Sequence, residues 1–93
     1  MRRTVWKFAL PVTDPTLQMQ SGAQVLSIGR SEMPDVIWLW AEVDPEAEPE
    51  TREFVVAGTG HPLGKDRGGF IGTVQAAHGL VWHVWYASRE VPA

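Results

Sequence analysis

Alternating apolar and polar positions run through most of the chain and predict short β-strands. Residues 2–10 place Trp6, Phe8 and Leu10 on one side, which is the two-residue period of a strand with one buried face. Residues 35–43 and 80–87 are apolar on both sides. Each of these two strands should therefore be central in a sheet or contact a partner subunit. The predicted strands are residues 2–10, 16–20, 23–30, 35–43, 52–60, 68–75 and 80–87.

This count of six to seven short strands at regular spacing predicts the fold class. No amphipathic helix of useful length is present, and residues 73–79 offer at most one helical turn. We expect an all-β fold, or a mainly β fold with a short helix, built as a small antiparallel sandwich or barrel. The length predicts a single β domain over residues 1–93, because a chain this short supports one modest core. Two segments are predicted to lie outside that core: an acidic, proline-rich hairpin loop at residues 44–52 and a flexible tail at residues 88–93.

Composition and charge narrow the function classes. The chain has no cysteine, which excludes a disulfide framework and cysteine-based zinc sites and fits a reducing cytoplasm. The net charge is −3 and the eight Lys and Arg are scattered, so we expect no binding to a DNA duplex. No apolar run reaches the roughly 18–20 residues that cross a bilayer, and Lys7 interrupts the only stretch that resembles a signal peptide. We therefore expect no membrane association.

The segment "GTGHPLGKDRGG", residues 58–69, contains most of the candidate chemistry. It fails as a Walker A loop because Thr59 stands where the first glycine belongs, Asp66 replaces the required Ser or Thr, and no helix can follow. It fails as a dinucleotide-binding fingerprint because the third glycine arrives one residue late, at Gly64. Neither nucleotide motif is therefore present.

Two interpretations of this loop stay open. One is a glycine-rich hairpin whose glycines supply positive φ angles. The other is an anion site, in which successive glycine amides and donor side chains hold a phosphate while a tryptophan stacks on a base. Core packing is the default interpretation of the five tryptophans of the chain, whereas stacking of one of them on a base would complement the second interpretation, with Trp40 as an alternative stacking residue. The predicted ligand-binding residues are Thr59, Gly60, His61, Lys65, Arg67 and Trp82.

The histidines do not indicate a metal or a catalytic site. His61, His78 and His83 show none of the familiar short spacings of zinc ligands, so we predict no metal and no cofactor. His83 shares a strand face with Val81 and Trp85, which favours a hydrogen-bonded core or interface histidine. No nucleophile motif occurs, so we predict no catalytic residues, with a hydrolase that uses His61 and His83 as the less favoured alternative.

Five segments carry distinctive motifs: "SGAQVLSIG", "IWLWAEVD", "FVVAGTGHPL", "GGFIGTVQ" and "LVWHVW". Together they resemble a family of small proteins of tailed bacteriophages and prophages whose function is unknown. The resemblance covers residues 4–86, and the chain departs from the family in a longer acidic loop at residues 42–53. It implies a phage origin and a location in the cytoplasm of the bacterial host.

Two functional hypotheses follow. The first is a non-enzymatic protein that binds a small anionic ligand, such as a cyclic nucleotide, and sequesters a nucleotide-type signal of host antiviral defence. The second is a protein-interaction module that inhibits a host factor or takes part in phage assembly, using the two-sided strands 35–43 and 80–87. Because a chain this short has little to cover both faces of those strands, we also expect self-association into a dimer or larger oligomer.

Overall fold

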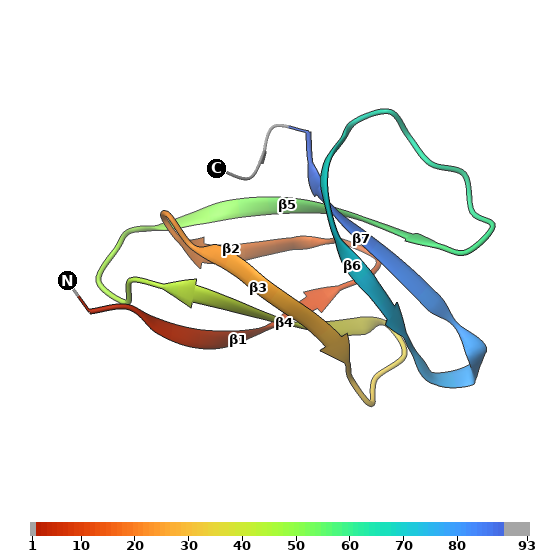
Figure 1. Ribbon diagram of the computed structural model, residues 1–93, viewed down its shortest axis with the longest axis horizontal. Coiled ribbons are helices and arrows are strands. Elements are labelled where there is room, and N and C mark those ends of the chain that lie inside the picture. The colour runs from red at the N-terminus through yellow and green to blue at the C-terminus, as the bar shows by residue number, and fades with distance from the viewer. Residues whose placement is uncertain (1, 89–93) are drawn as a thin grey trace.

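The computed structural model describes residues 2–88 and consists of seven strands in two antiparallel sheets (Figure 1). Within these residues the only helical element is a single 3₁₀ turn, at Ala77–Gly79, and no helix is long and apolar enough to cross a membrane. The predicted all-β fold is therefore confirmed. The strands are β1 (Thr4–Pro11), β2 (Thr16–Gln20), β3 (Gln24–Arg30), β4 (Val36–Val43), β5 (Pro49–Gly58), β6 (Arg67–Gln75) and β7 (Val81–Ala87).

The two sheets form two layers with different strand counts. One sheet has the order β1-β4-β3 and the other the order β2-β5-β7-β6. Their edges approach each other where β3 lies beside β6 and where β1 lies beside β2, but the sheets stay separate and no closed barrel forms. The shortest dimension of 18 Å fits two sheets packed about 10 Å apart.

Strand β4 shows how the sequence builds the core. Ile37, Leu39, Ala41 and Val43 alternate along it and are fully buried, because β1 and β3 flank the strand and its inner face meets the second sheet. The predicted central position of this strand is confirmed. The remaining core residues come from both sheets and from the turn before β3: Leu10, Met19, Ala23, Phe54, Val74 and Val84.

Three segment predictions need correction or fall outside the structure. The acidic segment 44–52 is a loop only over residues 44–48, because β5 begins at Pro49 and its first residues pair with β2. It is also not a hairpin, since it connects β4 in one sheet to β5 in the other. The predicted helical turn shrinks to the 3₁₀ turn because β6 continues to Gln75. Of the predicted tail, residues 89–93 lie outside the described residues.

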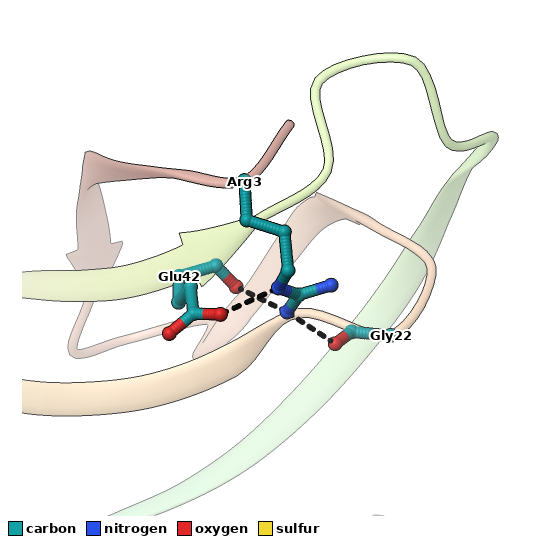
Figure 2. A network of polar contacts seen from close by, with 3 residues as sticks. All are labelled: Arg3, Gly22 and Glu42. Carbon is teal, nitrogen blue, oxygen red and sulfur yellow. Dashed lines mark hydrogen bonds and ion pairs between the residues drawn. The ribbon is translucent and has the colours of Figure 1, made fainter. Parts of the chain in front are cut away.

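A polar network ties the start of β1 to its neighbours. The Arg3 guanidinium donates through Nε to the Glu42 carboxylate, at 2.5 Å, and also reaches the carbonyl oxygens of Glu42 and Gly22 at 3.3 Å (Figure 2). Gly22 lies in the tight turn before β3, where its φ of +80° suits a residue without a Cβ atom. The network joins the residue before β1, the turn before β3 and the end of β4, and it neutralises the Glu42 charge.

Tyr86 places an ionisable hydroxyl between the two sheets and gives a prediction about pH. Its burial raises the pKa of the phenol, while Arg52 and a hydrogen bond with the Val25 backbone lower it by smaller amounts. Because the folded protein holds this proton more tightly than the unfolded chain, whose tyrosine titrates near pH ~10, the tyrosine's contribution to stability is complete below that pH. It is lost as the pH rises through the folded pKa.

The stability of the wild type against urea should therefore fall as the pH rises above about 10. The stability of the Tyr86→Phe variant should fall less steeply over the same pH range. At neutral pH the same variant should lose only about 1 kcal/mol, the usual value of one hydrogen bond. The two proteins differ only at residue 86, so the difference between the two slopes isolates Tyr86. Parallel slopes for the two proteins would rule out this role.

Candidate functional site

The loop at residues 59–66 connects two strands that are not neighbours. Strands β5 and β6 both pair antiparallel with β7, which lies between them, so they run parallel to each other. The hairpin interpretation of the loop is therefore wrong. Gly58 pairs with Trp82 and Arg67 with Ala87, so the loop travels about 16 Å along β7 at ~3.3 Å per residue. All of its residues are exposed, and it forms a wide arc that stands away from the sheets (Figure 1).

His83 lies on the outer face of the four-stranded sheet, between two threonines. The Oγ1 atom of Thr59 is 2.8 Å from its Nε2 atom, and the Oγ1 atom of Thr73 is 3.0 Å from its Nδ1 atom. The predicted hydrogen bonding of His83 is confirmed, but the residue does not belong to the core. Three strands meet here, because Thr59 follows β5, His83 belongs to β7 and Thr73 belongs to β6. The imidazole is held at both ring nitrogens, which fixes its orientation.

Aromatic and cationic side chains continue this face beyond His83. Trp85 lies two residues along β7, and its ring meets Phe70 edge to face at 5.4 Å between centroids. The guanidinium of Arg67 lies over Trp85 at 5.1 Å and donates to the carbonyl oxygen of Gly64 at 2.9 Å. Phe70 is 57% exposed. We call this surface the histidine face: Thr59, Arg67, Phe70, Thr73, His83 and Trp85.

The structure divides the predicted ligand-binding residues between two sides of the sheet. Thr59 and Arg67 belong to the histidine face. Trp82 points inward, where it packs against the core. His61 lies beside it, with 6.4 Å between the ring centroids, and covers the inner side of Gly58. Gly60, at φ +87°, and the exposed Lys65 stay in the loop.

This arrangement bears on two of the earlier hypotheses. His61 and His83 lie on opposite sides of the sheet, so they do not form the catalytic pair of the two-histidine hydrolase. Within residues 2–88, no three His, Cys, Asp or Glu side chains gather as a metal site would require. Trp82 is half-buried, and its indole N–H has no hydrogen-bond partner within the described part of the chain. Trp82 therefore resembles a core residue more than a stacking platform.

Sequence reasoning missed Thr73 and Phe70 as members of the site. Both lie on β6, whose register against β7 shifts between Arg67 and Phe70 and again between Phe70 and Gly72. Each shift moves later side chains to the other face, so simple alternation could not show which residues of β6 share a face with His83. The available signal was on β7, where His83 and Trp85 are two residues apart.

Comparisons with known proteins give one match. A family model described as a domain of unknown function (DUF7352) matches residues 1–93. No curated protein and no solved structure matches the chain.

Proposed function

Because the chain belongs to the DUF7352 family, a domain of unknown function, its role has to be inferred from its own site. We propose that the histidine face binds a small anionic ligand without turnover. The ligand class is a nucleotide or a close relative. The hydrogen bonds that join Thr59, His83 and Thr73 beside Arg67 are the observation that supports this proposal most directly.

The hydrogen bonds between His83 and the two threonines suit a polar ligand. A neutral imidazole donates at one nitrogen and accepts at the other, so one threonine hydroxyl accepts from His83 and the other donates to it. The accepting hydroxyl keeps its own proton free to donate to a ligand oxygen. Thr59 and Thr73 are both exposed. Whichever ring nitrogen of His83 carries the hydrogen, one threonine hydroxyl can therefore donate to a ligand in solvent.

Charge and aromatic surface complete the proposed site. Arg67 supplies a guanidinium that can bind a phosphate through two parallel hydrogen bonds. Its position is already restrained by Trp85 and Gly64, which reduces the entropy lost on binding. Phe70 offers an exposed ring for stacking a base. Lys65 adds a second positive charge on the loop that crosses β7.

Arg67→Gln should weaken nucleotide binding by about ten-fold or more, because charge-assisted hydrogen bonds contribute about 1.5–3 kcal/mol. Calorimetry against cyclic and linear nucleotides measures the affinity of the wild type and the variant. Arg30→Gln is the matched control, since Arg30 is an exposed arginine on β3 of the other sheet. No heat with any nucleotide in the panel would refute the proposal, as would an equal loss of affinity in both variants.

The more specific proposal is that a phage protein sequesters a nucleotide-type signal of host antiviral defence. It rests on the family resemblance together with the hydrogen-bond donors and the guanidinium of the histidine face. Ligand that has been bound at saturation should be recovered chemically intact after the protein is denatured. Recovery of a hydrolysed product would favour an enzyme instead.

A second candidate function is a protein-interaction module. It is favoured by the exposed Phe70 and by the half-buried tryptophans on the outer faces of β4 and β7. Self-association into a dimer or larger oligomer belongs to the same candidate. In that case the histidine face would contact a protein partner, Phe70→Ser would release that partner, and the wild type would bind no nucleotide.

A further inference from the structure

His83 is held by two groups that can each donate or accept a hydrogen bond. The Oγ1 atoms of Thr59 and Thr73 lie 2.8 Å and 3.0 Å from its two ring nitrogens. A carboxylate or a carbonyl in either position would only accept, and would keep the nitrogen beside it protonated. A hydroxyl can reverse its role by rotating its hydrogen. The two threonines therefore accommodate both the neutral and the protonated ring without a movement of heavy atoms.

Protonation of this ring changes how many hydroxyl hydrogens are free for a ligand. In the neutral ring one nitrogen accepts, so one threonine donates its hydrogen to His83 and only the other hydroxyl hydrogen is free. In the protonated ring both nitrogens donate, so both threonines accept and both hydroxyl hydrogens are free. Thr59 and Thr73 are exposed. One proton added to His83 thus gives the site a second hydroxyl donor as well as a positive charge.

The charged groups around His83 leave that positive charge available to a ligand. Glu53 is the only carboxylate on the outer side of β5, and it lies four residues from the position that pairs with His83, about 13 Å along the strand. On β6 the only charged residue is Arg67, and Lys65 and Asp66 precede it at the end of the loop far from Thr59. Among the described residues of β5, β6 and β7, no acidic side chain therefore lies beside His83.

The ring of Trp85 lies next to both cations of the site. Its centroid is 6.4 Å from that of His83 and 5.1 Å from the guanidinium carbon of Arg67. A protonated His83 and Arg67 are therefore close enough to act on a single ligand of nucleotide size. Two like charges disfavour each other, and an anion bound beside them offsets that repulsion. Binding of an anion and protonation of His83 thus reinforce each other.

We propose that the histidine face is a pH-sensitive anion site, in which protonation of His83 frees the second threonine hydroxyl and strengthens binding. This inference rests on the proposed function and adds the regulation of the same site. Histidine side chains change charge between about pH 5 and 8, so binding is tightest below that range and weakest above it. An opposite charge at about 4–6 Å favours the charged form of an ionisable group by ten-fold or more. We therefore expect affinity to change by about ten-fold across the range.

The test is calorimetry of the full chain at constant ionic strength and at pH values of about 5.5, 7 and 8.5, which span the titration of histidine. The probes are three phosphodiesters: 3′,5′-cyclic AMP, 3′,5′-cyclic GMP and the dinucleoside monophosphate ApA. Their phosphates keep the same charge over this range, whereas a phosphate monoester titrates near pH ~6. Affinity should fall about ten-fold from the lowest to the highest pH. At the middle pH the heat should also depend on the ionisation enthalpy of the buffer, because binding takes up part of a proton.

Three variants assign the pH dependence to a residue. His83→Gln keeps a side chain that can donate and accept but cannot titrate, so its affinity should be the same at all three pH values. His61→Gln is the matched control, because it removes a histidine from the inner side of the sheet and should leave the pH dependence intact. Arg67→Gln should weaken binding at every pH, since arginine stays charged throughout.

The outcomes separate this inference from the proposed function. Equal affinity of the wild type at the three pH values would overturn the inference and leave the proposed function standing. Absence of binding by all three probes at every pH would count against both. A pH dependence that persists in His83→Gln, or that disappears in His61→Gln, would overturn the inference by assigning the effect to another group. If His83→Gln does not fold, the wild type decides, because a heat of binding that is independent of the buffer would exclude proton uptake.

Discussion

Replacing Leu39 by alanine is expected to lower the free energy of unfolding by about 3 kcal/mol, within the range for leucines in packed cores. Leu39 is fully buried at the centre of β4 and belongs to the hydrophobic cluster that joins the two sheets. Removing three heavy atoms there leaves a cavity that strands on both sides cannot collapse to fill. Since small domains have only about 5–15 kcal/mol of stability in total, the loss should be visible in a single urea titration.

Leu26→Ala is the matched control for this prediction. Leu26 is 53% exposed and lies on the adjacent strand β3, where the pairing with β4 shifts between Val25 and Ser27. The same chemical change should cost less than about 0.5 kcal/mol there, as is usual at the surface. Equal losses in the two variants would show that the core is not centred on β4.

The alternation of β4 is the part of the fold that the sequence predicted best. Residues 35–43 are apolar at alternating positions on both sides, and the structure has Ile37 and Leu39 on the buried side and Trp38 and Trp40 on the other. Local sequence is sufficient here because the side chains of a strand alternate whatever its neighbours are. The same reasoning placed His83 and Trp85 on one face of β7.

Strand order could not be predicted in the same way. Insertion of β7 between β5 and β6 brings Thr73 to His83 and turns the loop at residues 59–66 into a crossover. These contacts join residues from different strands, and nothing in the local pattern of β6 indicates which strand it pairs with. The candidate site was therefore predicted only in part: Thr59 and Arg67 belong to it, whereas His61 and Trp82 turn to the inner side.

The glycines of residues 58–69 also show that local sequence does not predict every structural role. The sequence suggested that they serve the loop through positive φ angles, and Gly60 does so at +87°. Gly68 has a different role, which depends on a neighbour 19 residues later in the chain. A Cβ atom on Gly68 would lie 2.8 Å from the carbonyl oxygen of Ala87, so the start of β6 can approach β7 only without a side chain at this position.

Gly68→Ala is therefore expected to destabilise the protein by about 2 kcal/mol, within the range for an inserted methyl group that has no room. The obstructing atom is backbone and cannot rotate away, so the first residues of β6 must separate from β7. That separation moves Arg67, the residue before Gly68, away from Trp85. Nucleotide affinity at the histidine face should fall together with stability, by about the same factor as in Arg67→Gln.

Gly64→Ala is the control from the same glycine-rich segment 58–69, because a Cβ atom there meets nothing within 4 Å and its φ is not positive. It should leave urea stability within about 0.5 kcal/mol of the wild type and keep the nucleotide affinity. Equal effects of the two substitutions would mean that loop entropy, and not the contact with Ala87, sets the requirement for glycine. A Gly68→Ala protein that is destabilised but binds nucleotides normally would separate the β6–β7 pairing from the histidine face, and Arg67 would then not be a ligand-binding residue.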